Sequence, residues 1–191
     1  MIETALIANP WYAAALVGAA YILGYIIALY AARLYDAGAQ KLIFYREGYP
    51  AGREYADTWK RGRPASARFL AVLAVVVAAT PLVGQVALER FARPELFMAV
   101  VGGLVLVEAA ESLEHLRNIA LFRQALGGVS VRGKIELAQR AVLTMRYVQW
   151  YTLALIFFGM ALLAGSWFCA GGALGCVVAA QRLRDWVIMR T

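Results

Sequence analysis

The stretch LVLVEAAESLEHLRN, from Leu104 to Asn118, places acidic side chains directly after a strongly apolar run. That run covers only residues 96–107, which is 12 residues and about 18 Å of helix. The hydrocarbon core of a bilayer is about 30 Å thick, so a crossing helix would have to continue to about residue 115. The sequence therefore predicts that Glu108 and Glu111 lie inside the membrane or at its inner shoulder.

The composition of the chain is that of a membrane protein. Of its 191 residues, 62% are hydrophobic and 16% charged, and the mean hydropathy is +0.63. A soluble domain is usually about half apolar and about a quarter charged, so an ordinary soluble protein is excluded. The net charge of +7 fits Lys and Arg in cytoplasmic loops, and we expect the lipid bilayer rather than nucleic acid as the partner.

Five apolar segments predict five transmembrane helices in a single all-α membrane domain. Between Tyr147 and Gln181 there are 35 residues without a charge, too many for one ordinary span. The Gly165–Trp167 stretch supplies a break between two antiparallel helices. A bundle of four helices is the alternative. The predicted spans are about 11–33, 68–88, 95–115, 147–165 and 167–184.

The segments between the spans predict two features at the cytoplasmic side. Residues 36–65 form a basic loop, in which the KLIFY stretch at 41–45 is either a short strand or a continuation of the helix. Residues 116–146 are expected to form a helical hairpin that extends the third and fourth spans, with its turn at 127–133. Within the spans, small residues are spaced for close helix contact at Ala20, Gly24, Ala28 and Ala32, and at Gly171 and Gly175.

The distribution of basic residues predicts the orientation. With five spans and the N-terminus outside, 17 of the 19 Lys and Arg residues fall on the cytoplasmic side. This asymmetry is the positive-inside pattern of multi-pass membrane proteins. We therefore expect a protein of the inner (plasma) membrane, with its C-terminus in the cytoplasm.

One face of the third predicted helix collects polar side chains. At 100° per residue, Glu108, Glu111, Ser112 and His115 fall within an arc of about 100°, while Glu114 and Arg117 point towards headgroups or water. A charge at the middle of a bilayer costs about 2.5 to 3.5 kcal/mol, so ion pairing or protonation is expected. The candidate partners for these carboxylates are Arg182, Arg146, Gln149, Gln181 and Tyr25.

Several functions follow from this polar face, and the sequence leaves them open. The leading hypothesis is a channel- or transporter-like protein with an intramembrane carboxylate path for ions or protons. The alternative is a non-catalytic scaffold or complex subunit, in which the carboxylates form a structural ion pair and the basic cytoplasmic face binds a partner or anionic lipid headgroups. Either function is compatible with assembly into a homo-oligomer or a larger membrane complex. A membrane enzyme acting on lipid headgroups, with Glu or His as the general base, is third.

The sequence predicts neither a metal ion nor a cofactor. Glu108, Glu111 and His115 have a spacing that can converge on one ion, but metal sites in helix bundles take ligands from a second helix. The chain has no other histidine. It also lacks the glycine-rich patterns that bind dinucleotides or phosphates.

Overall fold

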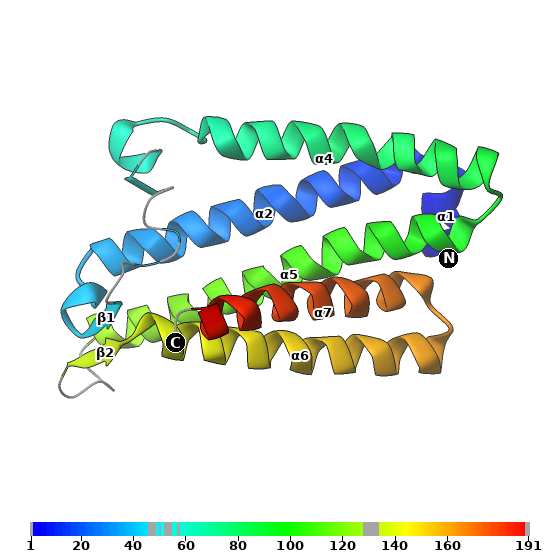
Figure 1. Ribbon diagram of the computed structural model, residues 1–191. Coiled ribbons are helices and arrows are strands. Elements are labelled where there is room, and N and C mark those ends of the chain that lie inside the picture. Colours follow the sequence, from blue (N-terminus) through cyan, green and yellow to red (C-terminus); the bar gives the residue numbers. More distant parts are fainter. Residues whose placement is uncertain are drawn as a thin grey trace.

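The computed structural model describes residues 2–45, 49, 51, 55–56, 58–127 and 134–189. Most of these residues lie in helices that run along one another (Figure 1). The long helices are α2 (Pro10–Asp36), α4 (Ala67–Gln85), α5 (Pro94–Leu126), α6 (Gln139–Ala164) and α7 (Trp167–Met189). Shorter elements are α1 (Ile2–Ala8), η1 (Ala39–Lys41), η2 (Trp59–Arg61), the π-helical turn η3 (Val86–Arg90), and strands β1 (Ile43–Tyr45) and β2 (Ile135–Leu137).

The predicted all-α membrane bundle is confirmed. In the described part of the chain, four helices are long and apolar enough to cross a membrane: α2, α4 with its η3 extension, α5 and α6. Helix α7 has 23 residues, but Arg182, Arg184 and Asp185 shorten its apolar stretch. It nevertheless packs along both α5 and α6. A fifth crossing, by α7, stays a prediction.

The two ends of the bundle differ in what they hold (Figure 1). The N-terminus, the α4–α5 turn and the α6–α7 turn lie at one end, while β1, β2 and the C-terminus lie at the other, which we call the β end. At the N-terminal end, the Ser166 hydroxyl donates to Glu3 Oε1 at 2.5 Å, which ties α1 to the α6–α7 turn. The long helices α2, α4, α5, α6 and α7 run back and forth along the bundle, so the N-terminus and the C-terminus lie at opposite ends of it.

Local sequence signals set where the helices begin and end. Asn9 caps α2 by accepting from Trp11 N at 3.0 Å, and Pro10 opens the helix. Ser66 caps α4 by accepting from Phe69 N at 3.1 Å. Gly165 ends α6 with φ of 62°, a left-handed conformation that favours glycine and allows the reversal into α7.

Glycines let α5 and α7 approach until their backbones touch. A Cβ atom added to Gly102 would overlap the backbone of Phe168, and one added to Gly171 would overlap the backbone of Ala99. Gly175 lies against Val107 in the same interface. The close approach predicted from the Gly171 and Gly175 spacing is therefore made with α5.

The region expected to form a helical hairpin contains a strand. Helix α5 continues to Leu126, but α6 begins only at Gln139, and β2 pairs in parallel with β1. The KLIFY stretch is thus a strand at residues 43–45, with alternating burial typical of a pleated backbone. This pairing attaches the basic loop to the segment before α6 through backbone hydrogen bonds. In one of them, Ile135 N donates to Leu42 O at 2.7 Å. The predicted turn at 127–133 lies almost wholly outside the described residues.

The α5–α7 contact makes position 171 intolerant of a side chain. We expect Gly171→Leu to lower the melting temperature in detergent by about 5 °C or more, because the obstacle is backbone that cannot move aside and overpacking costs about 1 to 3 kcal/mol. Gly159→Leu on α6 is the matched control, since a Cβ there meets no atom within 4 Å. Equal melting temperatures for the two variants would show that α5 and α7 do not touch at these glycines.

Candidate functional site

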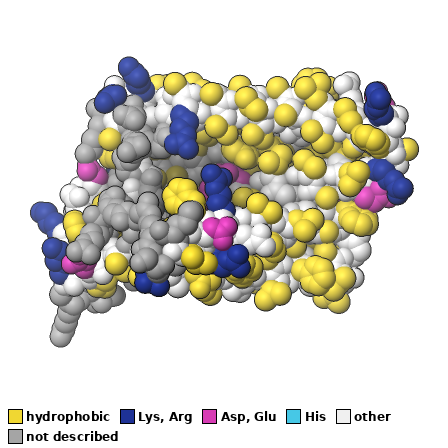
Figure 2. Space-filling view, viewed as in Figure 1, with side chains coloured by type: hydrophobic (Ala, Val, Ile, Leu, Met, Phe, Trp, Pro, Cys, Tyr) yellow, Lys and Arg dark blue, Asp and Glu magenta, His cyan; other side chains and the backbone are white. Residues whose placement is uncertain are grey.

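A cavity of about 230 Å³ lies between α2, α4 and α5. On the face drawn in Figure 2, many hydrophobic side chains are exposed, and a few acidic side chains lie among them. The cavity is lined from α2 by Tyr21, Gly24, Tyr25 and Ala28, from α4 by Arg68, Phe69 and Val72, and from α5 by Glu108, Glu111 and His115. Three of the four predicted polar-face residues therefore line one cavity.

Glycine 24 makes room for the Glu108 carboxylate. A Cβ atom at this position would overlap the carboxylate and would lie 3.1 Å from Ser112 Oγ. Gly24 belongs to the stripe of small residues on α2, and at this position of the stripe α2 meets the Glu108 and Ser112 side chains of α5. The polar face of α5 is thus turned towards α2, with Glu108 half-buried and Ser112 buried.

Of the five predicted partners, only Tyr25 lines this cavity. Its ring stacks on Phe69 with centroids 3.8 Å apart, and its hydroxyl accepts from Ser66 N at 3.0 Å. These contacts fix the start of α4 against α2. Arg68, which follows the α4 cap, brings a cation to the cavity wall.

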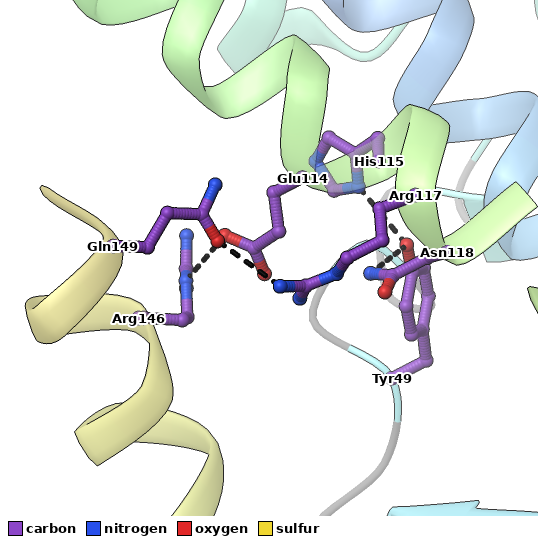
Figure 3. Close-up of polar contacts among 7 residues, drawn as sticks. All are labelled: Tyr49, Glu114, His115, Arg117, Asn118, Arg146 and Gln149. Atoms are coloured by element: carbon purple, nitrogen blue, oxygen red, sulfur yellow. Dashed lines mark hydrogen bonds and ion pairs between the residues drawn. The ribbon is translucent and has the colours of Figure 1, made fainter. Parts of the chain in front are cut away.

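Arg146 was one of the five candidate partners of Glu108 and Glu111, and the structure pairs it with a third glutamate. Arg146 Nε donates to Glu114 Oε2 at 2.7 Å (Figure 3). The prediction that Glu114 points to headgroups or water was wrong, because its exposure is 5%. Glu114 does lie on a different side of α5 from Glu108, as expected, but α6 covers that side.

The other predicted partners do not reach the cavity. Gln149 accepts from Arg117 at 3.1 Å on the same side as the Glu114 pair (Figure 3). Gln181 and Arg182 are exposed on α7. Within the described residues, no hydrogen bond or ion pair joins either of them to Glu108 or Glu111.

Tyr49 connects the basic loop to α5 and was not anticipated. Its hydroxyl lies 2.9 Å from His115 Nδ1 and accepts from Asn118 Nδ2 at 3.3 Å (Figure 3). Burial raises the pKa of the Tyr49 phenol above its ordinary range, so the hydroxyl keeps its proton. The hydroxyl therefore stays neutral and forms a hydrogen bond with Nδ1, in which the His115 tautomer decides which atom donates.

An aromatic cluster holds Tyr49 in place. Its ring lies 5.3 Å from that of Tyr35 and 5.4 Å from that of Phe122, measured between centroids. Tyr35 also accepts from Tyr45 N at 3.1 Å, so β1 joins the same cluster. Because Tyr49 and His115 are 66 positions apart, no local spacing in the sequence could have indicated their contact.

Comparison with known proteins adds no functional assignment. No protein-family profile, curated protein or solved structure matches this chain. Among the residues that the structure describes, no group of three His, Cys, Asp or Glu side chains is arranged to hold a metal ion. The function is therefore inferred from the side chains that line the cavity.

The Glu114–Arg146 pair gives a test of the site that is independent of function. We expect Arg146→Met to destabilise the protein by about 3 kcal/mol, because it leaves a buried carboxylate without its cation. The double variant Arg146→Met/Glu114→Gln should recover most of this loss. Denaturant or thermal unfolding in detergent would measure both. A double variant as unstable as Arg146→Met alone would mean that the two side chains are not coupled.

Proposed function

We propose that this multi-pass membrane protein is a transporter, or a transporter subunit, in which the α2–α4–α5 cavity binds a proton or another cation. The observation that carries the proposal is the placement of Glu108. Its carboxylate lies in a cavity against Gly24, and within the described chain no ion pair joins it to Arg or Lys. Ionisable side chains at this depth without a structural partner commonly mark ion or proton pathways.

The division of charges on α5 supports a functional role for the cavity. Arg146, a basic side chain of α6, is bound by Glu114 on another side of α5. Glu108 and Glu111 are therefore left to the cavity, where His115 offers an imidazole held by Tyr49. If the carboxylates had a purely structural role, we would expect them to form an ion pair with an Arg or Lys side chain.

A second cavity favours a transporter over an open channel. It has a volume of about 750 Å³ and lies at the N-terminal end between α1, α2 and α4, where Gln85 and Glu89 contribute polar side chains. The residues of α4 that line it, from Ala74 to Gln85, lie on a different face of the helix from Arg68, Phe69 and Val72. Two separate cavities at different depths fit access that alternates between the sides of the membrane.

The basic loop offers a second candidate function, binding of anionic lipid. The orientation with 17 of 19 Lys and Arg residues on one side would place a strongly positive surface against the cytoplasmic leaflet. Such surfaces attract anionic headgroups by about 1 kcal/mol for each basic residue near the membrane. This role is compatible with transport and does not use the cavity.

Flux measurements test the transport proposal. In liposomes loaded with a pH-sensitive dye, under a potassium diffusion potential, the wild-type protein should move protons or exchange them for cations faster than empty liposomes do. Glu108→Gln should reduce this rate at least tenfold, because it removes the cavity charge. Asp185→Asn, an exposed carboxylate on α7, should leave it unchanged. A wild-type rate equal to that of empty liposomes, for protons and for a panel of inorganic and organic cations, would refute the proposal.

Cysteine labelling tests the proposed orientation. After replacement of Cys169 and Cys176, an impermeant maleimide should label Ala92→Cys in intact cells. It should label Gln40→Cys and Asp185→Cys only after permeabilisation, because the positive-inside pattern places the β end in the cytoplasm. Labelling of position 185 together with position 92 in intact cells would rule out five spans.

A further inference from the structure

We propose that the ligand of the α2–α4–α5 cavity is an organic ammonium ion with an apolar tail, which enters from the bilayer between α4 and α5. This inference rests on the proposed transport function and names the chemical class of its substrate. It follows from three features of the cavity: its opening, its walls and its supply of oxygen ligands.

The cavity opens sideways, towards lipid. Helices α4 and α5 each pack on α2, but they scarcely contact each other beyond their connection at the N-terminal end. Towards the β end the two helices diverge (Figure 1). At the cavity, Val72 of α4 and Glu111 of α5 are both exposed. A ligand can therefore reach Glu108 from the membrane while its tail stays among the acyl chains.

The walls of the cavity suit an ammonium group. Glu108 and Glu111 supply negative charge on one side, and the stacked Tyr25 and Phe69 rings form an apolar wall opposite α5. A weakly hydrated alkylammonium gains from a carboxylate and from aromatic surfaces together. A volume of about 230 Å³ holds such a headgroup but not a whole amphiphile, so the tail must remain outside.

The same walls are poor ligands for an inorganic cation. A dehydrated Ca²⁺ or Mg²⁺ ion needs about six oxygen ligands. The α5 face offers two carboxylates, and no three-ligand group exists in the described chain. Arg68 stands at the same wall as a further cation. The positive charge of Arg68 weakens the binding of any cation by electrostatic repulsion. An amphiphile can offset this repulsion through apolar contacts, whereas a small, strongly hydrated ion cannot.

Binding of octyltrimethylammonium to the protein in phosphatidylglycerol nanodiscs tests the inference. After subtraction of empty nanodiscs, calorimetry should show saturable binding. Glu108→Gln should weaken it at least tenfold, whereas Asp185→Asn should leave it unchanged. Val72→Trp, at the exposed rim, should also weaken binding by narrowing the entrance without altering any charge. Melting temperatures of all variants show whether each is folded.

The comparison ligands separate the possible outcomes. Octyl sulfate should not bind at this site, and exchange of sodium for lithium or potassium should not alter the affinity. If nanodiscs of phosphatidylcholine weaken binding of the probe, the lipid's own trimethylammonium headgroup competes for the site; unchanged affinity identifies a free amphiphile as the ligand. Equal probe binding by wild type and folded Glu108→Gln, or specific competition by one inorganic cation, would overturn the inference. Cation or proton flux that depends on Glu108 without probe binding would leave the transport proposal standing and this inference refuted.

Discussion

The structure depends on one constraint: the uncharged apolar run of α5, residues 96–107, is shorter than the hydrocarbon core of a bilayer. The sequence therefore predicts that this helix carries carboxylates to a depth where charge is costly. Each carboxylate meets a different neighbour. Gly24 has no side chain, so the Glu108 carboxylate fits against α2. Arg146 of α6 forms an ion pair with Glu114. Glu111 lines the cavity and is exposed.

These arrangements divide α5 into two sides with different properties. On the α6 side, Glu114 and Arg146 form an ion pair that joins α5 to α6, and α7 packs against the glycines of α5. On the α2 and α4 side, the polar groups border a cavity. The closed contacts therefore lie on one side of α5, and the carboxylates that face the cavity lie on the other.

The sequence predicted the polar face of α5 because it depends only on helical periodicity and on the length of an apolar run. It also predicted the helices and the close approach at Gly171. It failed where the outcome depends on which helices become neighbours. Arg146 was one of several candidate partners for Glu108 and Glu111, and its ion pair with Glu114 was not predicted because depth along a helix does not say which side faces α6. Tyr49 could not be found, since its contact with His115 arises only after the basic loop folds back on α5.

A disulfide between positions 24 and 112 tests most directly whether the polar face of α5 lies against α2. A Cβ at position 24 would lie 3.1 Å from Ser112 Oγ, close to the separation of about 3 Å between a cysteine Cβ and its partner's sulfur in a disulfide. The two native cysteines are replaced, and Glu108→Ala is added to every variant because a side chain at position 24 would otherwise overlap the Glu108 carboxylate. In this background, Gly24→Cys/Ser112→Cys should form an intramolecular bond on mild oxidation, seen as a reducible gel shift. The pair Gly24→Cys/Leu113→Cys should not, because Leu113 is 53% exposed on another side of the helix. Bonding of the second pair in preference to the first would contradict the account.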